Sequence, residues 1–455
     1  MYVAFCAIQA LTARTDLPLE TGLPSPGSLS WIAALQSSHR GAIDQPDGRN
    51  YIVQKFLNLK GLLLDRRIYL LGLGAFAVST VAFLFSGLLP LIADDIGVSV
   101  AQAGYLVTAY SMSYAVFTPV LAAMTGRFDR RYVVGGALAA FVGGMMLTAF
   151  SQSIGVLILA QVITGMAAGL FAATGQGIAV TLSGPSERAK AISMVVSGTT
   201  FAVALGAPLG SFLAHYAGWR AGFGAVGAVA FICLIALLAL LPRNLPGARL
   251  SLSERLSVVR EPGVARLILM TFIVMASAFL VVGYFGPIVI DGAGMAPDML
   301  PVVLVVYGIG AILGNYLSGR LSDQIGPRRM IIASLVTSVV CSLMLAAILL
   351  WLPPAIAEPA LMVTLFIWAV VGWVYPPAQI SRLVAQAPGA AHLSLALHAS
   401  AIYLGIAAGT FIGGRVLEFA PPFALGPAAC IIAAIPLVMV LGERNIRNVP
   451  TASAA

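Results

Sequence analysis

Residues 319–329 read Gly-Arg-Leu-Ser-Asp-Gln-Ile-Gly-Pro-Arg-Arg, a short basic turn between two apolar stretches. The flanking stretches, 300–321 and 329–351, are each long enough to cross a ~30 Å hydrocarbon layer as a helix. A polar turn between two such stretches predicts a pair of antiparallel helices in lipid.

The whole chain has a composition of the same kind. Of its 455 residues, 60% are apolar and 9% are charged, whereas a soluble domain carries about 25% charged residues. So little charge cannot cover a water-exposed surface, and the lipid bilayer is therefore the expected surrounding. Because lipid offers no hydrogen-bond partners to the backbone, each crossing is expected to be helical.

Twelve apolar segments fit between Ile68 and Leu441, which predicts an all-α integral membrane protein with two six-helix halves. The helices expected in the first half, 67–241, are 68–93, 101–124, 132–150, 155–179, 189–214 and 221–241. Those expected in the second half, 264–441, are 264–290, 300–321, 329–351, 360–383, 392–416 and 422–441. Residues 242–263 form the expected linker, and 442–455 a C-terminal tail.

The first part of the chain has a different composition. Residues 1–50 are rich in Gly, Pro and Ser and show little periodicity, so we expect 1–66 to be a disordered tail. They do not have the form of a secretory signal peptide. A native start nearer Val53 is an alternative that the sequence leaves open.

The charges of the loops predict an orientation, because Lys and Arg collect on the cytoplasmic side of a membrane. With the N-terminus inside, the inner segments hold twenty Lys and Arg residues between Lys55 and Arg447, and the outer segments hold only Arg220 and Arg415. We therefore expect both termini in the cytoplasm and a location in a bacterial-type inner membrane.

Several other classes of function are disfavoured. The formal net charge is +8, but the basic residues lie in short loops rather than on one face, so no nucleic-acid partner is expected. Cys6, Cys233, Cys341 and Cys430 form neither a metal-binding spacing nor a disulfide framework. We see no phosphate-binding loop and no nucleophile–base constellation, and we expect no cofactor, no metal, no enzymatic activity and a monomeric chain.

The basic turn at 319–329 has a counterpart about two hundred residues earlier. Residues 122–131 read Ala-Ala-Met-Thr-Gly-Arg-Phe-Asp-Arg-Arg and follow the second expected helix as 319–329 follows the eighth. Two homologous halves are the simplest explanation of this repeat.

The second copy resembles the G-x-L-x-D-x-x-G-x-R signature of the major facilitator superfamily. Gly319, Asp323, Gly326 and Arg328 are in register with it, and Arg329 follows. The resemblance covers roughly 68–441 and implies a transporter in which these loops latch the halves in one conformation. Physically, Gly319 is expected to permit close approach of helices, and Asp323 to cap or pair with a neighbouring helix end.

The first copy departs from the signature. Gly126 occupies the position where an acid is usual, and Asp129, Arg130 and Arg131 follow it. This shortened form resembles the sugar and purine efflux branch of the drug:proton antiporter families, and we include all four residues in the expected latch.

The fifth helix carries a second resemblance. Gly198, Gly206, Pro208 and Gly210 are similar to the glycine–proline motif associated with exporters. Small residues let helices touch in lipid and proline bends them, which would limit leak near the outer gate. Ordinary packing of small residues is the alternative.

The carrier of a coupled proton is not evident. Relatives place an acid in the first helix where this chain has Ser79-Thr-Val-Ala-Phe83, and an arginine in the fourth where it has Gln161. His398 is the titratable candidate within a span. It is equally well interpreted as a neutral hydrogen-bonding residue.

Substrates of such helix bundles bind near the midplane between the halves, among aromatic and a few polar side chains. The candidates are Tyr110, Tyr114, Asn315, Trp368, Trp373, Gln379, His398 and Tyr403. The expected function is export of small organic solutes of the drug, sugar or purine type, coupled to protons. A facilitator or importer with the same fold, and a non-transporting receptor, are the alternatives.

Overall fold

The computed structural model describes residues 64–184, 187–247, 261 and 263–443, apart from the side chains of Asp323, Ala391 and His392. The predictions for the N-terminal tail up to residue 63, for most of the linker and for the C-terminal tail from residue 444 lie outside the described residues.

Twelve helices in the described residues are long and apolar enough to cross a membrane. Many of their large apolar side chains are exposed, as Ile232, Ile431 and Val438 are, each at more than 60%. In water such a surface would be unstable, so it is the surface that lipid covers. The predicted fold class is therefore confirmed.

Six spans make up the N-terminal set. They are α4 (Arg66–Ile96), α5 (Val100–Met124), α6 (Arg130–Phe150), α7 (Ile154–Leu182), a fifth span made of α8 (Arg188–Phe201), the π-helical η1 (Ala202–Gly206) and α9 (Ala207–Ala217), and α10 (Trp219–Leu240).

Six further spans make up the C-terminal set. They are a first span made of α12 (Val264–Val282), α13 (Phe285–Pro287) and η3 (Ile288–Gly292), then η4 (Pro297–Met299) with α14 (Leu300–Ile325), α15 (Pro327–Trp351), α16 (Pro354–Gln386), η5 (Pro388–Ala390) with α17 (Ala391–Phe419), and η6 (Pro422–Ala424) with α18 (Leu425–Leu441).

The expectation of one continuous seventh helix over 264–290 is wrong. α12 ends at Val282, and the chain resumes a helical form only at Phe285. Pro287 explains the break, because it has no N–H to donate to the carbonyl four residues earlier, that of Gly283. At the break, the side-chain hydroxyl of Tyr284 donates to the carbonyl of Thr410 on α17, at 2.6 Å.

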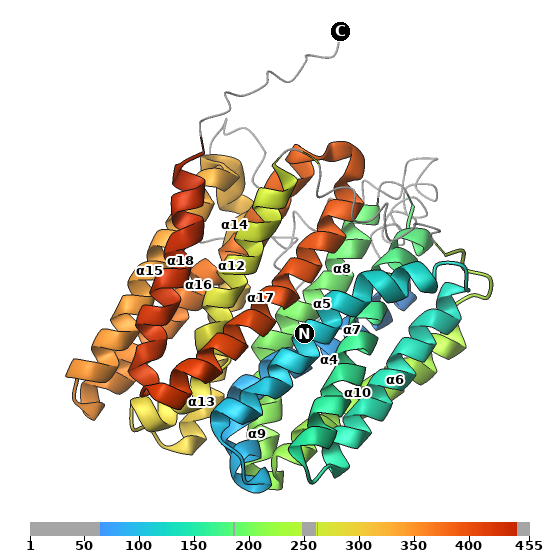
Figure 1. The fold of residues 1–455 in the computed structure, drawn as a ribbon. Helices are drawn as coiled ribbons and strands as arrows, with labels where there is room; N and C mark the ends of the chain where they lie inside the picture. The colour runs from blue at the N-terminus through green and yellow to red at the C-terminus, as the bar shows by residue number, and fades with distance from the viewer. Residues whose placement is uncertain (1–63, 185–186, 248–260, 262, 444–455) are drawn as a thin grey trace, which may run out of the picture. The chain divides into compact units, whose positions relative to one another are not determined.

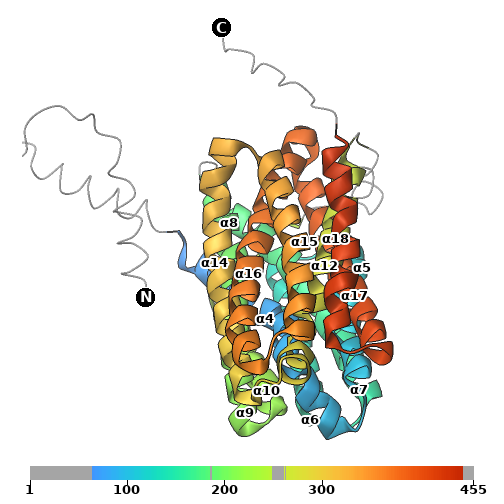
Figure 2. The same ribbon diagram turned by 90° about the vertical axis from the view of Figure 1, so that its left-hand side faces the viewer.

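The two sets repeat one packing scheme. α4 packs against α8 and α10 as α12 packs against α17 and α18, and α5 packs against α7 as α14 packs against α16. The pairs α6–α10 and α15–α18 complete the correspondence. Figure 1 shows the sets side by side, and Figure 2 shows α14, α15, α16 and α18 roughly parallel to one another on the flank of the second set.

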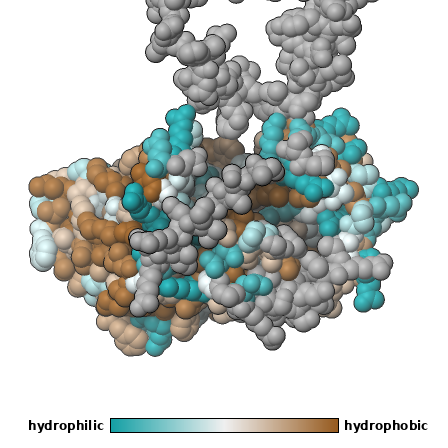
Figure 3. Space-filling view, turned by 90° about the horizontal axis from the view of Figure 1, so that it is seen from above, coloured by the Kyte–Doolittle hydropathy of each residue, from teal (hydrophilic) through white to brown (hydrophobic). Residues whose placement is uncertain are grey.

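One end of the bundle carries most of the basic residues of the described chain. We call it the basic end, defined by Arg66, Arg127, Arg130, Arg266, Arg328 and Arg382. Viewed from that end, hydrophilic residues gather around a central hollow in which hydrophobic residues are visible (Figure 3).

Close contacts between the sets lie toward the opposite end. A Cβ atom at Gly308 of α14 would lie 2.6 Å from the Cα of Ala204 in η1, and one at Gly286 would lie 2.6 Å from Pro90 of α4. Gly87 approaches Leu304 in the same way, at 3.0 Å. The sets therefore touch most tightly away from the basic end.

Candidate functional site

Three of the predicted substrate residues meet at the joint between the two sets. The rings of Tyr114 on α5 and Tyr403 on α17 are stacked, with centroids 3.5 Å apart and planes at 17°. Tyr110 lies one turn from Tyr114, with its ring centroid 6.4 Å from that of Tyr403, and its hydroxyl donates to the carbonyl of Val78 at 2.7 Å. This tyrosine cluster joins α4, α5 and α17.

Hydroxyl groups from the first and fifth spans extend the cluster. Ser79 on α4 shares a hydrogen bond of 3.1 Å with Thr199 on α8 and a further one with Tyr403. Ser79 belongs to the stretch 79–83, and it places an uncharged hydrogen-bonding group inside the first span. The sequence prediction did not include it, although two hydroxyl residues, Ser79 and Thr80, inside an apolar span were the available signal.

A second aromatic group lies one turn along α4. Phe83 packs against Phe279 of α12 and Trp373 of α16, with ring centroids 5.6 and 6.2 Å away. Tyr307 of α14 hydrogen-bonds Trp373 and packs on Phe285. Of this group only Trp373 was predicted from the sequence, because periodicity does not distinguish an aromatic side chain that faces the joint from one that faces lipid.

Asn315 also bridges the sets, although it is exposed. Its side-chain amide on α14 donates to the hydroxyl of Thr200 on α8 at 3.2 Å. Tyrosine and tryptophan rings, hydroxyls and one amide from α4, α5, α8, α14, α16 and α17 therefore surround the joint, a set of groups suited to an uncharged ligand with rings or hydroxyls.

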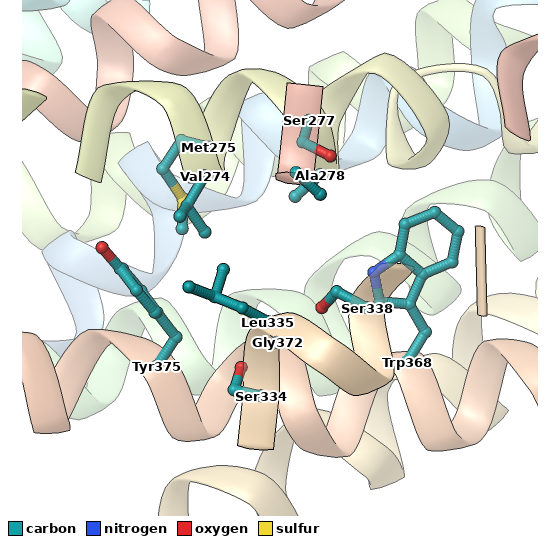
Figure 4. Close-up of a pocket in the computed structure, with 11 residues that line it drawn as sticks. Val274, Met275, Ser277, Ala278, Ser334, Leu335, Ser338, Trp368, Gly372 and Tyr375 are labelled. Carbon is teal, nitrogen blue, oxygen red and sulfur yellow. The ribbon is translucent and has the colours of Figure 1, made fainter. Parts of the chain in front are cut away.

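Three other predicted residues lie inside the C-terminal set. Trp368 lines a cavity of about 30 Å³ with Ser277 and Ser338, shown in Figure 4, which has room for one water molecule. The Nδ1 atom of His398 lies 3.1 Å from the hydroxyl of Thr271, and its buried Nε2 has no protein partner.

Gln379 is the third. Its side chain donates to the carbonyl of Leu267 on α12 at 2.8 Å and is fully buried. The structure thus separates Trp368, Gln379 and His398 from the tyrosine cluster and gives each of them contacts within the C-terminal set.

The first copy of the basic turn is fastened to the end of the sixth span. The carboxylate of Asp129 accepts from the backbone N–H groups of Arg131, Asn244 and Leu245 at 2.7–3.2 Å. Burial raises the pKa of Asp129, but these three amides and the charge of Arg131 outweigh it, so this pKa lies below its usual range. Arg131 in turn donates to the carbonyl of Leu238.

The second copy is fastened to the end of the twelfth span through Glu443, a residue that was not predicted from the sequence. Glu443, whose side chain is 15% exposed, pairs with Arg328 at 3.6 Å, Arg382 at 2.6 Å and Arg266 at 3.8 Å. Arg328 also donates to the carbonyl of Val440 at 3.0 Å. Each basic turn therefore holds the last helix of its own set.

The remaining residues of the expected latch differ in their surroundings. Gly326 has a φ of +84°, which favours glycine, whereas Gly319 has nothing within 4 Å of a Cβ built on it. The close helix approach expected at Gly319 is therefore absent. Arg329 is exposed, Gly126 lies in the turn itself, and the side chain of Asp323 lies outside the described residues.

The glycines of the fifth span pack on the first. A Cβ at Gly198 would lie 2.8 Å from the backbone nitrogen of Phe76, and one at Gly206 would lie 2.9 Å from the methyl group of Thr80. Gly210 contacts Leu84. Pro208 lies two residues after the π-helical turn Ala202–Gly206. The proline, which has no N–H to donate, therefore lies where the regular α-helical hydrogen bonding is already interrupted.

A profile of the Major Facilitator Superfamily matches residues 71–410, and again 267–454. The chain belongs to the major facilitator superfamily. Among curated proteins it is similar to two uncharacterized MFS-type transporters of Bacillus subtilis (strain 168). YbcL is 28% identical over 77% of this chain and 89% of its own length, and YtbD is 30% identical over 76% and 87%.

Solved structures of the superfamily share the fold at low identity. The human organic anion transporter MFSD10 (TETRAN) superposes with a TM-score of 0.61 at 16% identity, covering 82% of this chain and 99% of that one. A D-xylose–proton symporter gives 0.66 at 16%, covering 82% and 95%, and the nucleoside transporter NupG gives 0.63 at 11%, covering 83% and 99%. The chain is thus a multi-pass membrane transporter of small molecules.

Proposed function

We propose that this transporter exports small, uncharged organic solutes by alternating access, acting as a monomer and coupled to protons. The observation that carries the substrate class is the joint between the sets, where Tyr110, Tyr114 and Tyr403 meet the hydroxyls of Ser79 and Thr199. Aromatic faces and hydroxyls recognise rings and hydroxyl-bearing solutes without demanding a charge.

The direction of export rests on the orientation. With the basic end in the cytoplasm, as the distribution of Lys and Arg favours, the hollow of Figure 3 opens toward the cytoplasm and the tight contacts lie toward the outside. A solute would then enter the joint from the inner side and leave when the contacts at Gly308 and Gly286 open.

Two further features support the proposal. The packing of Gly198, Gly206 and Gly210 on α4 fits a seal in an exporter. The basic turns, fastened by Asp129 and by the pairing of Arg328 with Glu443, fit latches that move with the end of each set.

For protons the candidate is His398, whose Nε2 is buried without a protein partner. A specific observation favours a facilitator as the second candidate function. Among the described residues, the fully buried polar side chains are hydroxyls, the amides of Gln161 and Gln379, and this single imidazole. This set contains no carboxylate that could carry a proton, and a facilitator needs none.

Proteoliposomes test both functions. Purified protein should move at least one of D-xylose, inosine and chloramphenicol, and an imposed pH gradient should drive the solute against its own gradient. Tyr403→Ala should lower the flux at least tenfold, whereas Tyr216→Ala, at a tyrosine that is 74% exposed on α9, should leave it unchanged. Flux that ignores the pH gradient would replace the exporter with the facilitator.

A further inference from the structure

A groove lies on the flank of the N-terminal set, formed by α5, α6 and α7. Its volume is about 320 Å³, and its lining is apolar apart from the hydroxyls of Thr125 and Tyr132. The walls include Leu121 of α5 and Met166 and Leu170 of α7. It is distinct from the tyrosine cluster at the joint.

Small residues on α6 make the groove deep. Gly136 and Ala140 form part of its lining, are exposed, and a Cβ built at Gly136 meets nothing within 4 Å. From Tyr132 to Ala140 the helix rises about 12 Å at 1.5 Å per residue. Half of a hydrocarbon layer is about 15 Å thick, so the groove runs from the level of the basic end to near the bilayer centre.

The mouth of the groove is basic. Arg127 is exposed and follows Thr125 by two residues, and Arg130 precedes Tyr132 by two residues. The guanidinium of Arg130 lies against the end of α7, 3.5 Å from the hydroxyl of Thr181. The nearby carboxylate, that of Asp129, is turned to three backbone amides. Tyr132, 63% exposed, adds a hydroxyl at the same level.

We propose that this groove binds one anionic phospholipid, with an acyl chain in the apolar slot and the phosphate at Arg127 and Arg130. An apolar slot at acyl depth and a cationic mouth at headgroup level match the two parts of such a molecule and their separation. A zwitterionic lipid offers the same chain but no net charge, and inorganic phosphate offers the charge but no chain. The site therefore requires both features at once.

The lipid occupancy of the full-length protein tests this. Protein stripped of lipid in detergent is mixed with phosphatidylglycerol, phosphatidylcholine, oleate or inorganic phosphate, and bound molecules are counted by native mass spectrometry. We expect one phosphatidylglycerol to be retained at least tenfold more tightly than phosphatidylcholine. The double variant Arg127→Gln/Arg130→Gln should remove that preference.

The chain offers a matched pair for the slot itself. Gly136 and Gly143 lie seven residues apart on one face of α6, and neither has an atom within 4 Å of an added Cβ, but only Gly136 lines the groove. Gly136→Leu should lower phosphatidylglycerol binding at least tenfold, and Gly143→Leu should not change it. Ala140→Leu, also in the lining, replaces Gly136→Leu if that variant does not fold.

Three outcomes would overturn the proposal. They are equal binding of phosphatidylglycerol and phosphatidylcholine by the wild type, retention of oleate or phosphate as tightly as phosphatidylglycerol, and undiminished binding in both groove-filling variants.

Discussion

Three arginines from three separate segments share one carboxylate, that of Glu443, just beyond the end of α18. Arg382, with a side chain 14% exposed, lies closest to it, and Arg266 and Arg328 are more exposed. Without the carboxylate, these cations would repel one another in a partly desolvated place. Glu443→Gln should therefore destabilise the protein by about 1.5–3 kcal/mol, the range for a hydrogen bond to a charged group.

Thermal unfolding in detergent measures this difference. Glu418→Gln serves as the control, because Glu418 pairs with Arg415 three residues away on the same helix, in a more exposed position. Exposed pairs contribute little, so this control should stay within about 0.5 kcal/mol of the wild type. Equal shifts for the two variants would show that the Glu443 cluster is no more than another surface pair.

Asp129 gives a prediction about pH. Its pKa is lowered in the folded protein, so its contribution is present above the unfolded value, about 3.9, and is lost as the pH falls through the lower folded value. Asp129→Asn keeps the helix cap but weakens the bonds to Asn244 and Leu245. The wild type should be more stable by about 1 kcal/mol at pH 7, and the difference should shrink at pH 3. If the unfolding midpoints of the wild type and Asp129→Asn differ by the same amount at pH 7 and at pH 3, Asp129 is not ionised in the folded protein.

How far single residues were predictable depended on their surroundings. Asp129 and Arg328 belong to turns whose repeat and basic character mark them in the sequence. Glu443 carries no such mark, because it follows the last apolar span in what reads as a tail. Tyr114 and Tyr403 were selected for their chemistry, but their stacking depends on how two helices nearly three hundred residues apart meet, which no local pattern contains.

At the scale of elements, the contact between the fifth and first spans depends on glycine. A Cβ at Gly198 would lie 2.8 Å from the backbone nitrogen of Phe76, and backbone cannot move aside as a side chain does. Gly198→Ala should therefore push α8 from α4, at a cost of about 1–3 kcal/mol, and should lower flux.

Gly224 on α10 is the matched control. An added Cβ there meets nothing within 4 Å, so Gly224→Ala should be neutral or stabilising by up to about 1 kcal/mol, the difference in helix propensity. Unfolding midpoints and flux measured side by side separate steric conflict from propensity. If Gly198→Ala behaves like Gly224→Ala, the two helices are not held as closely as described.

The predicted helix boundaries agree with the observed ones to within a few residues for most spans, because the apolar runs end at charged turns. The seventh span, expected to be unbroken, was the exception. Its residues stay apolar through the break at Gly283–Tyr284, so hydropathy carries no signal of it. Pro287 was visible, but whether a proline kinks a helix or ends it depends on its tertiary neighbours, and here Tyr284 at the break is anchored by its hydroxyl to the carbonyl of Thr410.

At the scale of the molecule, the duplication that the basic turns indicated extends to the packing of whole helices. α5 crosses to α17, and α14 crosses to η1 and α9, so each set contributes its second span to a contact with the fifth span of the other. Such paired contacts let the sets rock about the joint without either set unfolding.

Alternating access requires the tight contacts opposite the basic end to separate in every cycle. Gly308 and Ala204 form one of them, since a Cβ at position 308 would lie 2.6 Å from the Cα of Ala204. In a protein whose native cysteines are replaced, Ala204→Cys with Gly308→Cys places two thiols across this contact, and oxidation should join them once the added Cβ has moved the helices slightly apart. The reduced double variant, which carries the same steric conflict, is therefore the reference for flux. The oxidised protein should lose at least nine-tenths of its flux, and reduction should restore it.

The position of this pair is what makes the result informative. The control is a disulfide within one set, between Met145→Cys on α6 and Gly227→Cys on α10, where an added Cβ at Gly227 would lie 3.1 Å from the Cβ of Met145. It would leave the sets free to rock, so only a general effect of oxidation would lower its flux. A disulfide between Ala204→Cys and Gly308→Cys blocks only motion of one set against the other. If the oxidised protein still transports at the wild-type rate, α14 and η1 need not part. The opening must then occur through smaller movements, such as bending at Gly283–Tyr284, which precedes α13 and its Gly286 beside Pro90.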